Sequence, residues 1–172
     1  MIFFRYKKEV SLLEIINKII INASAEKTWN IVGQGFGNAD KWLSMISSIK
    51  VKNDNTPLDG APCSGRVCMT DIGKVDETIT HYDETNKKLS FDIKVEKMPF
   101  FVKDLKNTWN VVSLEDNQTK VILDFKMEIM FPFNLLMGFM MKSKMGKIMK
   151  ISLKDLKHYV ETGKSRTDKA VV

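Results

Sequence analysis

The sequence contains few of the residues that interrupt or cross-link a chain: among 172 residues there are four prolines, nine glycines and two cysteines. This composition excludes a low-complexity tract and a glycine- or proline-rich linker that would divide the chain. Long apolar runs are also missing, because even the most apolar stretch, residues 127–141, contains Glu128, Pro132 and Asn134. We therefore expect a globular chain without a membrane-spanning helix.

Cysteine, histidine and arginine are too scarce to build the sites that they usually form. Cys63, at the edge of the strand predicted below over residues 64–70, and Cys68 within it have opposite parity, so we expect their side chains to point to opposite faces and not to bridge. The two histidines are too few for a histidine-based metal site, so no metal is expected. The net charge of +6 comes mainly from lysine and includes no arginine cluster, so we expect no nucleic-acid partner. No cofactor is expected either, because the glycines of residues 33–37 lack the preceding strand of a dinucleotide-binding motif. The first residues have no long apolar stretch followed by a small-residue cleavage site, so we do not expect them to act as a signal peptide. We expect a cytoplasmic protein with one domain over residues 1–163 and a disordered tail over residues 164–172.

Alternating apolar residues and turn residues predict the order of elements. An isoleucine-rich strand over residues 14–22 precedes a helix that begins near Ser24 and ends at the glycines of residues 33–37. A second short helix runs from Asn38 to Trp42. Six further strands are predicted over residues 45–52, 64–70, 74–82, 88–95, 105–114 and 120–130.

After Pro132 the apolar period becomes helical, with Asn134 as the expected N-cap and Gly163 as the end of the helix. Its predicted inward stripe consists of Leu135, Phe139, Gly146, Met149, Leu153, Leu156 and Val160. Antiparallel strands that bury one face need a cover, and this helix is long enough to provide it. The predicted fold class is α+β: a curved, seven-stranded antiparallel sheet wrapped around a long C-terminal helix, with two short helices after the first strand.

Several local sequences in this order resemble the START and polyketide cyclase/dehydrase (SRPBCC) superfamily over residues 14–162. These are INASAEKTW at residues 21–29, Gly65-Arg66, Glu77 within VDETI, and Pro132 before the long helix. Members share the helix-grip fold of birch-pollen allergens and abscisic acid receptors. The resemblance implies an internal cavity between sheet and helix for a hydrophobic or amphipathic small molecule. Hormone reception is not implied, because Leu43 stands where those receptors have a lysine and the gate-loop motifs are missing.

Strand parity predicts which side chains face this cavity. The expected ligand-binding residues are Arg66, Cys68, Glu77, Ile79, Phe91, Ile93, Asn107, Trp109, Phe125 and Met149. Most are apolar, and a few polar groups in an apolar lining are the usual composition of a small-molecule site.

Arg66 and Glu77 are the charged pair on this face. With Ile72 and Gly73 as the turn centre, Cys68 is expected opposite Glu77, and Arg66 diagonal to it. A carboxylate on a covered apolar face needs a partner, and the planar guanidinium of arginine matches it. Two hypotheses follow: the pair orients a polar end of the ligand, or it is a structural ion pair.

His81 lies inward by parity and, with Glu77 and Arg66, is a candidate for acid–base catalysis. Cys68 next to Glu77 is the one arrangement resembling a nucleophile and its base. A carboxylate neighbour raises a thiol pKa, however, so we expect Cys68 to be a small core residue.

The long helix is rich in methionine and lysine. Methionine adapts to an irregular core or a variable ligand, and the lysines form either a solvated face or a surface for transient contact with anionic membranes. The leading functional hypothesis is binding, and transport, of a hydrophobic small molecule. The alternative is a cyclase or dehydratase in which Glu77 and Arg66 move protons or stabilise an enolate.

Overall fold

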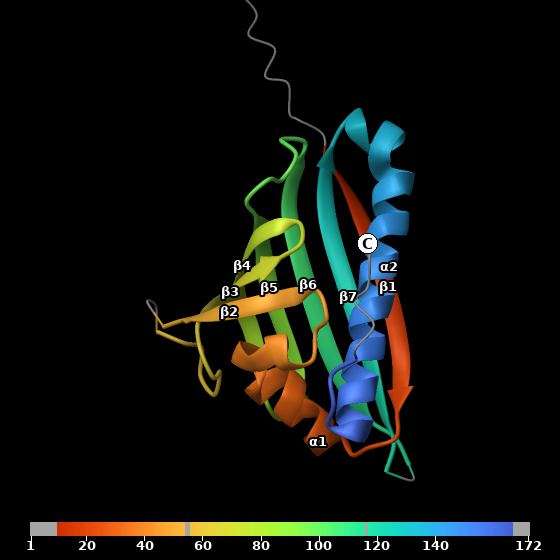
Figure 1. Cartoon of the computed structure of the whole chain (residues 1–172). Helices are drawn as coiled ribbons and strands as arrows, with labels where there is room; N and C mark the ends of the chain where they lie inside the picture. Colours follow the sequence, from red (N-terminus) through yellow and green to blue (C-terminus); the bar gives the residue numbers. More distant parts are fainter. Residues whose placement is uncertain (1–9, 54–55, 116, 167–172) are drawn as a thin grey trace, which may run out of the picture.

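A computed structural model describes residues 10–53, 56–115 and 117–166 of the chain (Figure 1). Seven antiparallel strands form one curved sheet in the order β1-β7-β6-β5-β4-β3-β2, and a long helix, α2 (Phe133–Thr162), lies along it. The strands are β1 (Val10–Ile21), β2 (Ile46–Lys52), β3 (Gly65–Thr70), β4 (Gly73–Asp83), β5 (Lys88–Val95), β6 (Val102–Ser113) and β7 (Thr119–Met130). The predicted helix-grip architecture is therefore confirmed. Most of the predicted tail, residues 167–172, lies outside the described residues.

Strand β7 shows how the sequence pattern produces the sheet. Every second side chain, including Val121, Leu123 and Phe125, is buried, whereas those between them lie half-buried on the outer face. This alternation follows from the two-residue period of a strand with one covered face. Strands β1 and β6 both begin earlier than predicted, at Val10 and Val102, because they continue to pair with the long β7.

The segment between β1 and β2 is helical as predicted, but it changes helix type. It consists of α1 (Ala25–Trp29), a π-helical turn η1 (Asn30–Gln34) and a 3-10 segment η2 (Phe36–Lys41). Ser24 caps α1, since its Oγ accepts a hydrogen bond from the backbone N–H of Lys27 at 3.2 Å. At Gly33 a Cβ atom would overlap the ring of Trp29. Glycine is therefore needed there for Trp29 to be fully buried.

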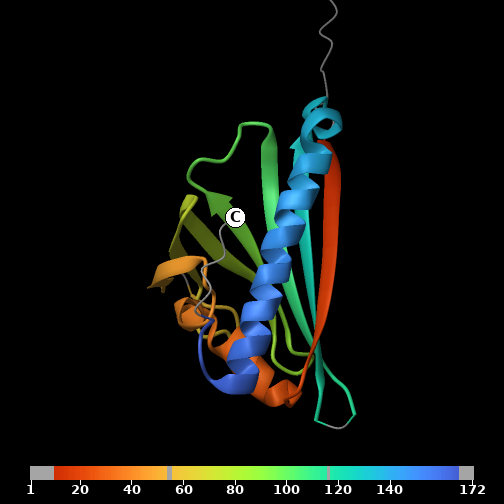
Figure 2. The ribbon, with the colours of Figure 1, turned by 45° about the vertical axis from the view of Figure 1, so that its right-hand side comes forward.

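Helix α2 runs diagonally along the sheet in Figure 2. It ends at Gly163, whose φ of +72° is the left-handed conformation that glycine adopts readily. It packs mainly on β1 and β7. The predicted inward stripe is correct for the second half, where Met149, Leu153 and Val160 are buried. In the described ranges, neither α2 nor another helix is long and apolar enough to span a membrane.

In the first half of α2 the predicted stripe is wrong. Leu135 and Phe139 are exposed, and the helix turns Gly138, Met141 and Met145 toward the sheet instead. The reason is that both faces of this half are apolar, so periodicity alone does not choose between them.

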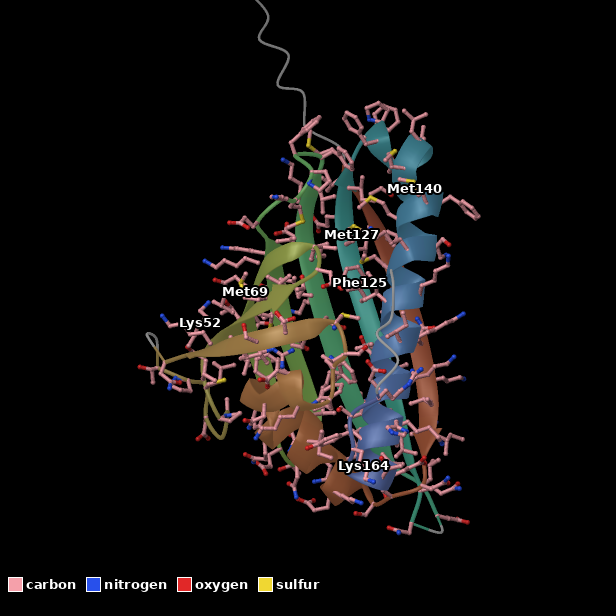
Figure 3. The ribbon with its side chains drawn as sticks, viewed as in Figure 1. Lys52, Met69, Phe125, Met127, Met140 and Lys164 are labelled. Atoms are coloured by element: carbon pink, nitrogen blue, oxygen red, sulfur yellow. The ribbon has the colours of Figure 1, made fainter. Side chains whose placement is uncertain are left out.

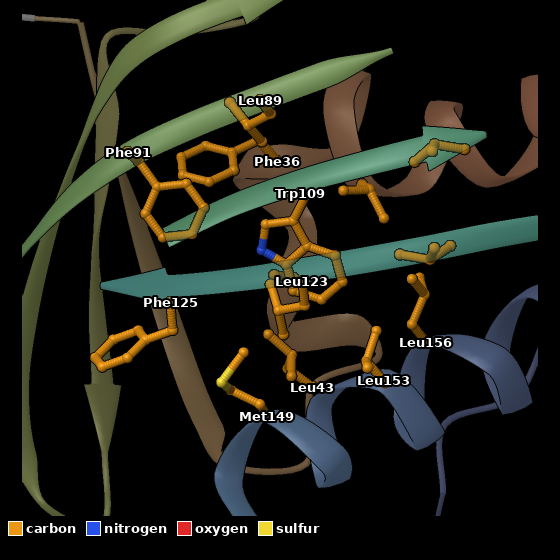
Figure 4. Close-up of a cluster of buried hydrophobic side chains, with 14 of the residues drawn as sticks. Phe36, Leu43, Leu89, Phe91, Trp109, Leu123, Phe125, Met149, Leu153 and Leu156 are labelled. Carbon is orange, nitrogen blue, oxygen red and sulfur yellow. The ribbon is translucent and has the colours of Figure 1, made fainter. Parts of the chain in front are cut away.

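The core lies between the inner face of the sheet, the second half of α2 and the helical segment before β2. Figure 4 shows this cluster, with Phe91, Trp109 and Leu123 from the sheet facing Leu43 and Leu153. Trp42 packs edge-on against Trp109, with ring centroids 6.0 Å apart. The short helical segment thus covers the centre of the sheet, where α2 does not reach.

Candidate ligand site

Arg66 and Glu77 form an ion pair inside this core. They lie directly opposite each other on β3 and β4, and Arg66 Nε donates a hydrogen bond to Glu77 Oε2 at 2.5 Å. Arg66 is 4% exposed and Glu77 is 8% exposed. Removing two charges from water is costly, so a pair at this depth depends on close contact and on further partners.

Further partners of Arg66 come from the helical segment and the sheet. Its Nη1 donates to the carbonyl oxygen of Phe36 at 2.5 Å. The guanidinium carbon lies 3.9 Å from the centroid of the Phe36 ring and 5.8 Å from that of the Phe91 ring. Arginine stacks well on aromatic rings because its guanidinium is planar and weakly hydrated. Arg66 therefore connects η2 to the inner face of the sheet at β3 and β5.

The predicted register of this hairpin is wrong by two residues. Thr70 pairs with Gly73, so Asp71 and Ile72 form the two-residue turn, and Gly73, with φ of +105°, is the first residue of β4. Side-chain parity is unaffected by a two-residue shift, and Arg66 and Glu77 still share the inner face. They are directly opposite rather than diagonal.

Cys68 lies opposite Val75 rather than Glu77, and its Sγ is 4.0 Å from Glu77 Oε2. Burial, and secondarily the Glu77 carboxylate, raise the pKa of the Cys68 thiol to about 12. At neutral pH the thiol is protonated, and a protonated thiol is not a nucleophile. Both Cys63 and Cys68 are buried and free.

His81, which parity placed inward, is exposed. A bulge in β4 between Ile79 and His81 reverses the parity of the strand beyond it. As a result Tyr82 turns inward, where its ring packs 5.3 Å from that of Trp29. Burial, and secondarily the Glu84 carboxylate, raise the pKa of Tyr82 to about 12.

A small hollow lies beside the ion pair. Its volume is about 10 Å³, and its walls are Val32, Phe36, Trp42, Arg66, Leu89, Phe91 and Trp109. A hollow of this size holds about one water molecule. The resemblance implied a larger cavity, but large side chains from the helical segment fill the space here. Phe36 and Trp42 were not among the predicted site residues, because a sequence does not show which loop side chain folds over a sheet.

Two buried polar atoms near the hollow have no hydrogen-bond partner in the described part of the chain. They are Trp42 Nε1, a donor, and Asn107 Oδ1, an acceptor. Asn107 pairs with Phe91 across β5 and β6, so its side chain adjoins the aromatic wall. An unsatisfied buried group costs about 1–3 kcal/mol, and such groups are uncommon in native structures.

The other predicted site residues form a continuous wall beside these groups. Ile79, Phe91, Asn107 and Phe125 are successive partners across β4, β5, β6 and β7. Ile93 is half-buried opposite Glu77, and Met149 is buried on α2. The nine predicted ligand-binding residues on strands share the inner face of the sheet, and the tenth, Met149, packs against that face from α2.

A second hollow, a groove of about 290 Å³, lies between β1 and the first half of α2. Its lining is Ser11, Leu12, Leu13, Glu14, Ile129, Asn134, Gly138, Phe139 and Lys142. This groove is far from the Arg66–Glu77 pair in the fold, because β1 and β3 are near opposite edges of the sheet. None of the predicted site residues line it.

Comparison with solved structures shows the same fold in proteins of low sequence identity. A START superfamily protein from Mycobacterium smegmatis is 17% identical, with a TM-score of 0.67 over 86% of this chain and 97% of that one. Truncated norcoclaurine synthase from Thalictrum flavum is 10% identical, with a TM-score of 0.70 over 89% and 96%. The di-domain ARO/CYC protein BexL of the BE-7585A biosynthetic pathway is 16% identical, with a TM-score of 0.71 over 87% of this chain and 46% of BexL.

Among curated proteins there is no match to this chain. Residues 14–161, by contrast, match a protein family described as polyketide cyclase / dehydrase and lipid transport. The match begins in β1 and ends in α2, so it includes all or most of every described helix and strand. The chain therefore belongs to the polyketide cyclase / dehydrase and lipid transport family and has its START-like helix-grip fold.

Proposed function

We propose that this protein binds a hydrophobic or amphipathic small molecule between the sheet and α2, beside the Arg66–Glu77 pair. The observation that carries the proposal is the pair of unsatisfied polar atoms, Trp42 Nε1 and Asn107 Oδ1, at an aromatic wall. A ligand with one acceptor and one donor would satisfy both atoms and bury its apolar part against Phe91. Membership of a family described by cyclase chemistry and lipid transport supports a ligand of this class.

Binding requires side chains to move, because the hollow holds only about 10 Å³. The side chains that occupy the space belong to Phe36 and Trp42 on the helical segment, and that segment contains glycines at 33, 35 and 37. Half-buried Met141 and Met145 lie along α2. Methionine has three rotatable bonds and repacks around variable shapes at little cost. The ligand therefore replaces packed side chains rather than filling an open cavity.

The Arg66–Glu77 pair has a positioning role in this proposal. Arg66 holds Phe36, and Phe36 covers the aromatic wall. A polar end of the ligand that competes for the guanidinium or the carboxylate would release Phe36 and open the space. The competing hypothesis remains that the pair only stabilises the fold.

A cyclase or dehydratase activity is the second candidate, and the family description supports it. In a cyclase or dehydratase mechanism of this kind, Glu77 accepts a proton from the substrate and Arg66 stabilises the enolate that forms. His81 is no longer a candidate for this chemistry, since it faces solvent. The two free, buried cysteines agree with a cytoplasmic location, which we also propose.

Titration with 1-anilinonaphthalene-8-sulfonate, an amphipathic fluorescent anion, tests the binding proposal. We expect saturable binding that is weakened at least fivefold by Asn107→Leu and by Trp42→Phe, because each removes one of the two polar atoms. Met69→Asp, at an exposed position on β3, is the control and should bind as the wild type does. Equal affinity in all variants would refute the site, and loss of binding in Phe139→Asp would place the probe on α2 instead.

A further inference from the structure

Exposed apolar side chains gather at one end of the molecule. They come from the segment between β5 and β6, the segment after β7, and the first turns of α2, at the top of Figure 3. They are Phe100, Phe131, Leu135, Leu136, Phe139 and Met140, and each is between 54% and 87% exposed. We name these six residues the apolar tip.

Ring contacts join two of the segments that carry the tip. The ring of Phe100 lies 5.3 Å from that of Phe133, at the start of α2, and Phe133 stacks on Phe101 at 4.8 Å. The segment before β6 and the beginning of α2 are therefore held together. Soluble monomers rarely expose contiguous apolar surface of this kind, and a patch with a polar rim marks an interaction site.

The rim of the tip is basic on the α2 side. Between Glu128 and Asp155 the sequence contains no acidic residue, while lysine occupies positions 142, 144, 147, 150 and 154. All five lysines are exposed. On the other side of the tip the charges balance, because Glu96 and Asp104 accompany Lys97 and Lys103.

One exposed stripe of α2 changes from apolar to basic along the helix. At spacings of three and four residues it consists of Leu136, Met140, Ser143, Lys147, Lys150 and Lys154. At about 1.5 Å per residue, Lys142 and Lys144 lie about 3–6 Å beyond Met140 and Lys147 about 10 Å beyond it. The polar layer of a bilayer is about 5–8 Å thick on each side. A helix that enters tip first would therefore place these lysines among the lipid phosphates.

We propose that the apolar tip inserts into the surface of an anionic lipid bilayer, with the lysines of α2 contacting the headgroups. A second copy of the chain is the poorer occupant, because pairing two tips would bring two sets of lysines together without acidic partners. This docking surface is separate from the Arg66–Glu77 site, and none of the tip residues lies in the walls of the hollow there.

Cosedimentation with large vesicles tests the proposal. We expect the full-length chain to sediment with vesicles of phosphatidylcholine and phosphatidylserine, and to sediment much less with phosphatidylcholine alone. Each lysine near an anionic surface contributes about fivefold in affinity. Lys142→Ala/Lys144→Ala should therefore weaken binding about 25-fold at low salt, and added salt should weaken binding of the wild type.

Met140→Asp and Met69→Asp form a matched pair of variants. Both methionines are exposed, 55% and 45% respectively, and Figure 3 shows them on α2 and β3, away from each other. Met140→Asp should weaken vesicle binding at least about tenfold, whereas Met69→Asp should leave it unchanged. Circular dichroism should show that both variants are folded, since neither side chain belongs to the core.

Three results would overturn the proposal. The first is equal binding by the two aspartate variants. The second is equal binding to neutral and anionic vesicles, which would remove the role of the lysines. The third is no vesicle binding at all; if sedimentation analysis then shows self-association that Met140→Asp abolishes, the tip is an interface between copies of the chain.

Discussion

Replacing Arg66 with methionine removes the cation from the buried pair but keeps most of the volume of the side chain. Glu77 would then be an isolated carboxylate at 8% exposure. Breaking a buried ion pair in this way costs about 3–5 kcal/mol, because the remaining charge has no partner. Glu77→Leu should cost a similar amount, since Arg66 would keep its charge, the Phe36 carbonyl and two ring contacts but lose the carboxylate.

The double variant Arg66→Met/Glu77→Leu is expected to be far more stable than the sum of the two single changes predicts. An apolar pair of similar volume often replaces a buried ion pair without loss. The hydrogen bond to the Phe36 carbonyl would still be missing, and this costs about 1–2 kcal/mol. We therefore expect the double variant to lie within about 2 kcal/mol of the wild type, with a coupling energy of at least about 4 kcal/mol.

Urea denaturation followed by tryptophan fluorescence measures these free energies of unfolding. Glu77→Gln serves as the conservative variant, because its amide still accepts from Arg66, and it should cost less than Glu77→Leu. Single variants that each cost less than about 1 kcal/mol, and that add in the double variant, would refute the view that the pair is buried and coupled.

Three further predictions concern other buried polar groups. Asn107→Leu should stabilise the ligand-free protein by about 1 kcal/mol in urea denaturation, because it removes an unsatisfied acceptor, and a loss of stability would contradict the unpartnered state of Asn107 Oδ1. The pKa of Cys68 is about 12 in the folded protein and ordinary in the unfolded chain, so this thiol should not affect the free energy of unfolding below about pH 8.5. Above that pH the free energy of unfolding should fall by about 1.4 kcal/mol per pH unit, because the unfolded chain loses the proton and the folded protein keeps it. In Cys68→Ala the free energy of unfolding should fall less steeply with pH, and identical profiles would show that the thiol is not buried as described. Asp155→Ala should lower the melting temperature by roughly 5–12 °C, because the fully buried carboxylate accepts hydrogen bonds from Ser44 N at 3.0 Å and Ser44 Oγ at 2.6 Å. A shift below about 2 °C in calorimetry would contradict a stabilising role of these hydrogen bonds.

The inner face of the sheet was predictable because alternation of side chains is a property of each strand by itself. Arg66 and Glu77 were placed on one face from parity alone, and they do share it. Their exact pairing was missed because a glycine with positive φ fits both the centre of a turn and the residue after it. In the structure Gly73 is the residue after the turn and the first residue of β4.

Features that depend on more than one element were not predictable. The bulge before His81 is a property of the pairing between β4 and β5, and no residue type marks it in the sequence. The filling of the hollow by Phe36 and Trp42 depends on how the helical segment folds over the sheet. The exposure of Leu135 and Phe139 depends on which side of α2 meets β1 and β7.

Native mass spectrometry of freshly purified protein, followed by denaturing extraction, shows whether the protein carries a small molecule. We expect a mass above that of the 172-residue chain, and an extracted apolar or amphipathic molecule whose occupancy falls in Asn107→Leu and Trp42→Phe. The same molecule at full occupancy in both variants would contradict the site. A protein that stays ligand-free, even after incubation with lipids, quinones and aromatic polyketides, would contradict the binding function itself.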